Sequence, residues 1–185
     1  MLSASHAIGL PSLSAIQSDC ALTLYIPSIR SPFPVRCQVA TVLPAYLKVV
    51  EALTPIMRGL PGVIVTIDGR DGVGKTTLGR YLAWHFNVTL IETDLFLIPA
   101  QDYLIHLDDQ INRIIERRIT SPRPVIVEGI AMLQLMKRIN RVSDFSIYVA
   151  NPQHSSSKTL ERRLSAYEAS FAPTATASIV VEIEH

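Results

Sequence analysis

The fold is decided by one stretch of the chain, Val63-Ile64-Val65-Thr66-Ile67-Asp68-Gly69-Arg70-Asp71-Gly72-Val73-Gly74-Lys75-Thr76-Thr77. Residues 63–67 are all apolar or β-branched, which predicts a buried β-strand. The apolar residues that follow the stretch repeat at helical spacing: Leu78, Tyr81, Leu82 and Phe86. Three glycines lie between the predicted strand and helix, so we expect the backbone to turn tightly there.

The glycine-rich turn matches the pattern G-x-x-x-x-G-K-[ST] of the P-loop, or Walker A motif, over residues 69–76. In this motif consecutive backbone N–H groups face phosphate oxygens, and the helix adds its positive N-terminal dipole. We expect Lys75 to reach the β- and γ-phosphates of ATP and the Thr76 hydroxyl to ligate Mg²⁺. The predicted nucleotide-binding residues are Gly69, Arg70, Asp71, Gly72, Val73, Gly74, Lys75, Thr76 and, through a secondary phosphate contact, Thr77.

Residues 61–185 alternate between short β-rich runs and amphipathic stretches. The predicted strands cover residues 63–67, 88–92, 125–128, 145–149 and 179–183, and helical patterns cover 78–86, 104–118 and 160–171. Parallel neighbours in a sheet need connections of this length. The pattern therefore predicts an α/β fold with three αβα layers and a five-stranded, mainly parallel sheet.

The chain before this domain is less informative. Residues 1–40 contain prolines that interrupt every candidate helix, so we treat them as an N-terminal extension without assigned structure. In residues 41–60, apolar side chains at helical spacing predict a helix that packs on the core. Pro55 is expected to kink this helix or end it early.

Composition limits the partners of the protein. The 185 residues are 48% hydrophobic and carry a net charge of +1, which gives no field suited to nucleic acid or an anionic membrane. No run of about 18 apolar residues is present, and the N-terminus lacks the features of a secretory signal. Cys20 and Cys37 are too far apart for a metal or redox pair, and we interpret them as free thiols. These features favour a cytoplasmic protein.

Carboxylates follow two of the predicted strands. Asp94 comes just after the second strand, where ligands of open α/β sheets bind, and we choose it as the base that orients the phosphate acceptor. The alternative is a helix cap or solvated loop carboxylate. Glu92, two residues earlier, either supports Asp94 from behind the site or is an ordinary charge at the end of the strand. Glu128 ends the third strand and is the candidate for holding Mg²⁺ or its water shell, with a buried structural glutamate as the alternative.

Cations on the last predicted helix are candidates for neutralising charge on the transferred phosphoryl group. Arg162 and Arg163 lie on one side of this helix, although a solvated helix face explains them equally well. We interpret Arg113, Arg117 and Arg118 as a solvated face. The histidines lack metal-ligand spacing, and none is assigned a ligand role.

These motifs together resemble the uridine kinase-like branch of P-loop kinases, which includes phosphoribulokinase and bacterial pantothenate kinase. The resemblance covers residues 45–185 and rests on the P-loop, on Thr93-Asp94-Leu95-Phe96, on residues 125–130 and on the late arginine-containing helix. It implies the strand order 2-3-1-4-5, a base at Asp94, the Glu-Gly pair at Glu128 and a lid arginine at Arg162. It also places residues 170–177 near the ATP base, with Pro173 and Thr174 as adenine-site candidates.

The sequence departs from that branch in two places. Residues 95–124 are short and lack the acceptor-binding insertion of uridine kinases, so the acceptor is not identified. Asp71 makes the loop similar to that of thymidylate kinases, but their Asp-Arg-Tyr or Asp-Arg-Phe motif is missing.

We therefore expect an ATP- and Mg²⁺-dependent kinase that transfers the γ-phosphoryl group to a nucleoside-like or metabolite hydroxyl. A thymidylate kinase-like nucleotide kinase, a nucleotide-dependent ATPase and a non-catalytic nucleotide-binding protein are the alternatives. The expected partners are ATP and a small-molecule acceptor, without nucleic acid or membrane, and the oligomeric state is left open.

Overall fold

The structure is a computed structural model that describes residues 43–98, 104–153 and 158–183. The predictions for residues 1–40, Cys20 and Cys37 lie outside the described residues. In the described ranges, no helix has both the length and the apolar character needed to cross a bilayer.

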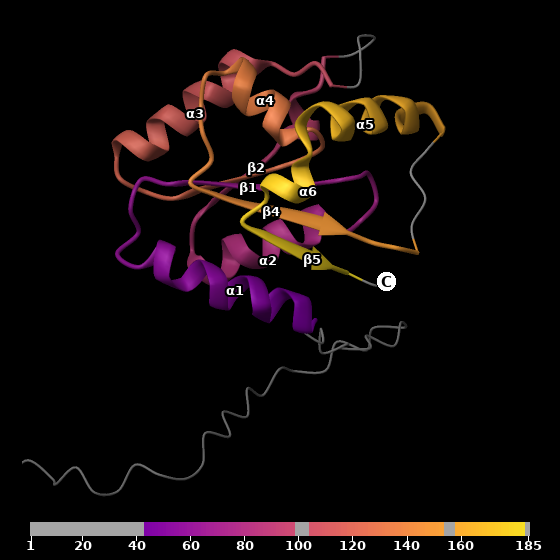
Figure 1. Ribbon diagram of the computed structural model, residues 1–185. Helices are drawn as coiled ribbons and strands as arrows, with labels where there is room; N and C mark the ends of the chain where they lie inside the picture. The colour runs from indigo at the N-terminus through magenta and orange to yellow at the C-terminus, as the bar shows by residue number, and fades with distance from the viewer. Residues whose placement is uncertain (1–42, 99–103, 154–157, 184–185) are drawn as a thin grey trace, which may run out of the picture. The chain divides into compact units, whose positions relative to one another are not determined.

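A five-stranded parallel sheet forms the centre of the domain (Figure 1). Its strands are β1 (Ile64–Gly69), β2 (Thr89–Glu92), β3 (Val125–Glu128), β4 (Phe145–Ala150) and β5 (Ile179–Glu182). They lie in the order β2-β3-β1-β4-β5, and every pairing is parallel. The predicted fold class and strand order are confirmed. Because the strands are parallel, their carboxyl ends share one edge of the sheet.

Helices cover both faces of the sheet. The helices α1 (Pro44–Met57) and α2 (Lys75–Phe86) lie on one face, and α3 (Asp108–Thr120), α4 (Met132–Arg138) and α5 (Lys158–Phe171) lie on the other (Figure 1). A 3-10 turn, η1 (Thr93–Phe96), follows β2, and the short helix α6 (Pro173–Thr176) precedes β5. One apolar cluster fills each interface between sheet and helices. The central strands β1 and β3 are buried along their whole length, which explains their nearly continuous apolar sequence.

Helix α1 packs on the core as predicted. Tyr46, Val49, Leu53 and Met57 are buried within the cluster that also holds residues of α2 and β1. The helix ends two residues after Pro55, at Met57. A proline this close to the end of a helix removes one hydrogen bond and leaves few further turns to disturb.

Two elements differ from the sequence-based expectation. Residues 104–107 are not helical: the Ile98 N–H donates to the Ile105 carbonyl at 3.1 Å, and the Leu107 N–H donates to the Phe96 carbonyl at 2.8 Å. Residues 96–98 and 105–107 thus pair with each other, and we call these two segments the hairpin. Because residues 105–107 belong to it, α3 begins only at Asp108. Helix α4 was not predicted, although its buried Met132, Leu135 and Met136 follow helical spacing over two turns.

Candidate functional site

The loop between β1 and α2 has the predicted strand-turn-helix context. Gly69 adopts φ +148°, and a Cβ atom there would lie 2.3 Å from the carbonyl oxygen of Val149 on the neighbouring strand. Gly74 adopts φ +94° immediately before α2 begins. Both positions require glycine, because a side chain would be strained or would collide with backbone. The loop is therefore held close to β4 at the carboxyl edge of the sheet.

The base of this loop is tied to two helices through Asp68. Its carboxylate is buried and accepts the Gly69 N–H at 2.8 Å and the hydroxyl of Tyr167. The Tyr167 oxygen also accepts the N–H of Leu133, in α4, at 3.3 Å. Burial raises the pKa of Asp68, although these hydrogen bonds favour its charged form. Tyr167 was predicted only as an apolar helix residue, and its contact with Asp68 crosses 99 positions of sequence.

The last two side chains of the motif, Lys75 and Thr76, each make a hydrogen bond within the protein. Lys75 is buried, and its Nζ donates to the carbonyl oxygen of Arg70 at 2.6 Å. The Thr76 hydroxyl donates to Oε1 of Glu128 at 3.0 Å. Burial lowers the pKa of Lys75 and raises that of Glu128, and the opposite charge of each side chain partly offsets the shift of the other.

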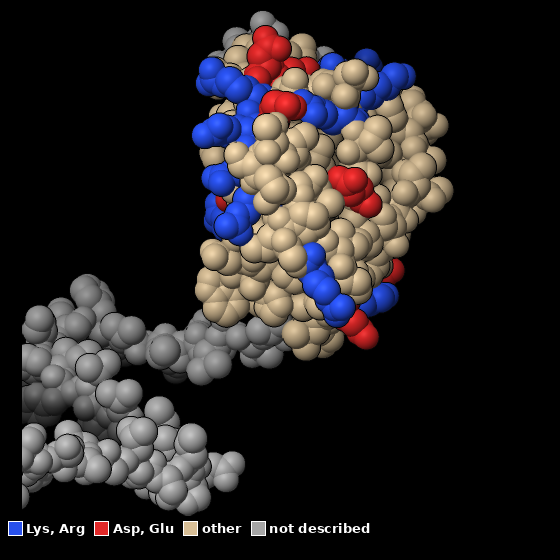
Figure 2. Space-filling view, turned by 90° about the vertical axis from the view of Figure 1, so that its left-hand side faces the viewer, with Lys and Arg blue, Asp and Glu red and all other residues tan. Residues whose placement is uncertain are grey.

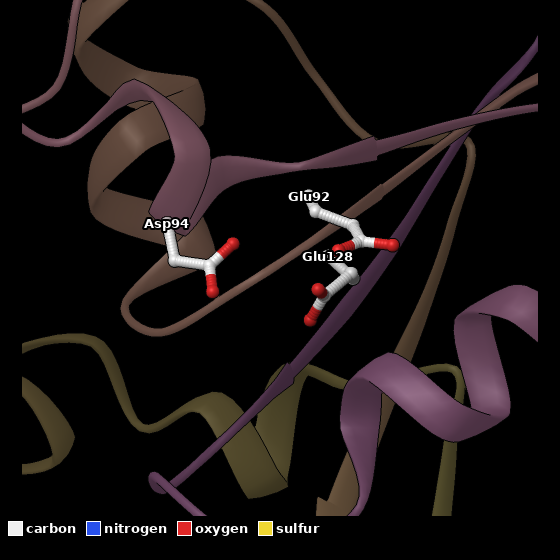
Figure 3. A group of neighbouring side chains, drawn as sticks. All are labelled: Glu92, Asp94 and Glu128. Carbon is white, nitrogen blue, oxygen red and sulfur yellow. The ribbon is translucent and has the colours of Figure 1, made fainter.

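Three carboxylates meet at the ends of β2 and β3. Glu92, Asp94 and Glu128 each bring an oxygen within 4.8 Å of the others, and Figure 3 shows Asp94 and Glu128 pointing toward a shared space. Glu92 instead accepts two hydrogen bonds from Arg80, at 2.7 and 2.8 Å, which lower its pKa. Of these three carboxylates, Asp94 and Glu128 line the cavity at this edge of the sheet, and Glu92 does not.

A cavity of about 260 Å³ contains these groups. Its lining is contributed by the phosphate loop, η1, the hairpin, the end of β3 and α5: Asp71, Gly72, Lys75, Thr76, Thr93, Asp94, Leu97, His106, Glu128, Gly129, Ile130 and Leu160. In the part of the chain that the structure describes, the buried Thr93 hydroxyl makes no hydrogen bond. A Cβ atom at Gly129 would lie 1.9 Å from that hydroxyl oxygen, so the glycine lets Thr93 reach its place in the wall.

His106 contributes a neutral imidazole to the same cavity. The His106 side chain is buried, and Nη2 of Arg138 lies 3.2 Å from Nδ1 of its imidazole ring. Arg138 is fixed by two hydrogen bonds to Asp108, at 2.7 and 3.0 Å. Because a guanidinium only donates, Nδ1 accepts and the ring proton resides on Nε2. Burial and then the charge of Arg138 lower the pKa of His106. This role of His106 could not be predicted from the sequence, because it depends on the pairing of residues 96–98 with residues 105–107.

A larger cavity, of about 600 Å³, lies between α4, α5 and the start of α3. Arg138, Arg163, Tyr167 and Phe171 are among the residues that line it. The His106–Arg138 contact joins a wall of this cavity to a wall of the smaller one. The strand-end site is therefore continuous, through packed side chains, with the face formed by α4 and α5.

Several predicted nucleotide-site residues do not line the smaller cavity. Val73 is buried in the apolar core, so only its backbone faces the loop, and Thr77 is exposed. Arg162 is exposed on α5, and the residue of α5 that lines the cavity is Leu160. The Arg70 side chain extends to α5, where it binds Glu161 and Glu168.

The adenine-site candidates Pro173 and Thr174 lie in the short helix α6, and their role stays a prediction. Pro173 is buried, and it lines a small cavity with Thr66 and Ser146, from the amino-terminal halves of β1 and β4, and with Asp68 and Tyr148, from their carboxyl-terminal halves. Residues 173–176 precede a parallel strand, so they lie toward the edge of the sheet opposite the phosphate loop.

The arginines of α3 also lie away from the phosphate loop. Arg113, Arg117 and Arg118 are exposed, as expected for a solvated face. Arg118 and Arg123 line a cavity with Thr89 and Pro124, at the amino ends of β2 and β3. Figure 2 shows Lys and Arg side chains gathered along one side of this end of the domain.

No protein-family model and no curated protein matches the chain. Among solved structures, a possible uridine kinase from Bacillus stearothermophilus is similar, with a TM-score of 0.55 and 13% sequence identity. That match covers 74% of this chain and 96% of the other. A shikimate kinase from Acinetobacter baumannii, in complex with shikimate, has a TM-score of 0.45 and 15% identity over 71% of this chain and 88% of that chain. The strand order, the phosphate loop and the first of these matches agree: the chain has the fold of the P-loop kinases.

Proposed function

We propose that the protein is an ATP-dependent kinase that transfers the γ-phosphoryl group to a hydroxyl of a nucleoside-like or other small metabolite. The observation that carries this proposal is the convergence of Lys75, Thr76, Asp94 and Glu128 on one cavity at the carboxyl edge of the sheet. A phosphate-binding loop supplies the donor side of such a reaction, and a carboxylate nearby supplies a base for the acceptor.

The residues present fit a magnesium ion with its nucleotide. The Thr76 hydroxyl and the carboxylates of Glu128 and Asp94 offer the oxygen ligands that Mg²⁺ prefers. The Thr93 hydroxyl, which has no hydrogen-bond partner among the described residues, gives the cavity a further polar group for a ligand to satisfy. In this proposal Thr76 and Glu128 hold the ion. When bound, Mg²⁺ would neutralise charge on the β- and γ-phosphate oxygens.

The chain's own groups then divide the work. Lys75 exchanges the Arg70 carbonyl for phosphate oxygens, which restores a favourable partner for its buried charge. Asp94 takes the proton of the acceptor hydroxyl, and the oxygen of that hydroxyl bonds to the γ-phosphorus of ATP. The bond between the γ-phosphorus and the oxygen that bridges it to the β-phosphate breaks, and ADP leaves with that oxygen. Arg162, from α5, is proposed to neutralise charge on the transferred group.

Two substitutions test the division between nucleotide binding and transfer. Lys75→Ala should weaken ATP binding by about 10- to 100-fold, since it removes charged hydrogen bonds to phosphate. Asp94→Asn should leave ATP affinity nearly unchanged and lower kcat by about 10²- to 10⁴-fold, the usual contribution of a general base. Titration calorimetry measures the first effect, and ADP release with a responsive acceptor measures the second.

Asp109→Asn is the matched control, because Asp109 is an exposed carboxylate on α3 that does not line the cavity. It should behave as the wild type in both assays. Full transfer activity in Asp94→Asn would remove this residue from the role of base. An ATP affinity unaltered by Lys75→Ala would contradict the phosphate-binding role of the loop.

A further inference from the structure

The side chain of Arg70 forms a clamp between the phosphate loop and α5. Its Nη1 donates to both carboxylate oxygens of Glu161 at 2.9 Å. Its Nε and Nη2 donate to the two oxygens of Glu168 at 2.9 and 2.7 Å. The Tyr148 hydroxyl, from β4, adds a 3.1 Å hydrogen bond to Glu168. The guanidinium thus binds Glu168 through two parallel N–H···O bonds, the bidentate geometry in which an arginine is most directional, and it binds Glu161 through Nη1 alone.

The Arg70–Glu168 half of this clamp differs from an ordinary surface ion pair, whereas the Glu161 side chain is 47% exposed. The Arg70 side chain is only 30% exposed, and that of Glu168 only 28%. The hydrogen bonds to Arg70 lower the pKa of Glu168, so the carboxylate is charged at neutral pH. An isolated exposed pair contributes little to stability, whereas a bidentate network with fixed partners contributes more.

The same residue also touches the phosphate-binding lysine. The Arg70 carbonyl accepts the hydrogen bond of Lys75, while the Arg70 side chain holds α5. Glu161 follows Leu160, the α5 residue that lines the smaller cavity. In Figure 1, α5 runs above the carboxyl end of β4. Glu161 is next to Leu160 in the first turn of α5, so holding Glu161 in place restrains the part of the helix that lines that cavity.

We propose that Arg70 is a positioning residue that anchors α5 to the phosphate loop and thereby holds Leu160 against the nucleotide cavity. The anchoring follows from the contacts alone, whereas the effect on nucleotide rests on the proposed function. Arg70 occupies a variable position of the phosphate-loop motif, so phosphate binding itself does not call for an arginine there. Without the guanidinium, α5 would keep the hydrogen bond of Tyr167 to Asp68 and that of Glu168 with Tyr148, and both of these join it to the sheet and not to the phosphate loop beyond Asp68.

Amide hydrogen exchange tests the anchoring without any need for activity. In Arg70→Met, the amides of α5 should exchange about tenfold faster, because two ion pairs that resist local opening are lost. A second variant, Glu161→Gln with Glu168→Gln, keeps the phosphate loop intact and preserves an acceptor for Tyr148. It should show the same acceleration. Amides of α3 should exchange as in the wild type in both variants.

Arg141→Met is the matched control. Arg141 binds Glu116 and Asn112 on α3, away from the phosphate loop, so its loss should leave exchange in α5 unchanged.

Raising the salt concentration should accelerate exchange of the α5 amides in the wild type, since salt screens partly exposed ion pairs. The difference in exchange rate between the wild type and the clamp variants should therefore become smaller.

The effect on the cavity is measured by the dissociation of a fluorescent ATP analogue in stopped flow. Both clamp variants should release the analogue about three- to tenfold faster than the wild type, in line with the loss of partly exposed ion pairs. Wild-type exchange of α5 in both clamp variants would overturn the proposal, as would unchanged dissociation when the wild type binds the analogue. A wild-type protein that binds no ATP would instead overturn the proposed function, while the exchange experiment would still decide whether Arg70 anchors α5.

Discussion

At the scale of single residues, hydrogen bonds within the protein hold the side chains of Lys75 and Thr76 at the point where the loop that follows β1 enters α2. Lys75 rests on the Arg70 carbonyl at 2.6 Å, and Thr76 on Glu128 at 3.0 Å. A nucleotide would take over the donors of Lys75, whose charge is disfavoured by burial. This arrangement limits the ordering that binding must impose, because a buried lysine has already lost most of its rotamer freedom.

The buried His106 leads to a prediction about pH. Its pKa is lowered from 6.5 by burial and by Arg138, so in the range just below 6.5 the unfolded chain binds a proton that the folded protein does not. The free energy of unfolding should therefore fall as the pH drops below about 6.5. His106→Gln should flatten this fall, since glutamine does not titrate.

Urea denaturation between pH 5 and pH 8 measures the effect. The comparison at pH 8 gives the cost of losing the imidazole's packing, and only the change with pH is assigned to protonation. The same pH slope in His106→Gln and the wild type would contradict the assignment of a neutral, buried His106.

Much of the residue-level geometry could be predicted from the sequence. Lys75 and Thr76 belong to a motif with known geometry, and Asp94 and Glu128 follow strands whose carboxyl ends share an edge, so their meeting in one cavity follows from the fold. Thr93, His106 and Tyr167 could not be assigned, because their contacts come from a hairpin and from a helix distant in sequence. The partners of Arg70 escaped prediction for the same reason: Glu161 and Glu168 lie more than 90 positions away.

At the scale of elements, α1 should contribute to the stability of the domain. Leu53 is fully buried between α1 and the sheet, and Leu53→Ala should lower the free energy of unfolding by about 2–5 kcal/mol, through lost burial and a residual cavity. Leu47 lies on the same helix but is 54% exposed, so Leu47→Ala should cost much less. Urea unfolding monitored by circular dichroism compares the two, and equal losses would contradict the packing described for α1.

The strands and the longer amphipathic helices were predicted well, and the short helices α4 and α6 were not. The strands and α2 could be predicted from the sequence, because buried parallel strands are runs of apolar residues. In amphipathic helices, apolar residues recur every three to four positions. Residues 104–107 read as helix because Leu104 and Leu107 fit that repeat, but their backbone groups pair with residues 96–98. Local periodicity does not reveal such a pairing, since it depends on a partner strand segment.

At the scale of the whole molecule, connection lengths predicted a parallel sheet but did not order its strands. The order 2-3-1-4-5 came from the family resemblance, and the structure confirms it. With this order β1 lies between β3 and β4, which brings the phosphate loop beside Glu128 on one side and beside the Tyr148–Glu168 contact on the other. Charge is also distributed along the strand direction: three carboxylates meet at the carboxyl edge, and exposed arginines lie at the amino edge.

The most direct test of the central claim is ADP release from Mg-ATP by the purified protein, with and without a panel of nucleosides, nucleotides, pantothenate and sugar phosphates. If the protein is a kinase, we expect that ATP binds and that one class of acceptor accelerates ADP release. We also expect that Asp94→Asn abolishes this acceleration. Bound ATP with a flat response across the panel would favour an ATPase or a non-catalytic nucleotide-binding protein. A protein that binds no ATP would contradict the central claim.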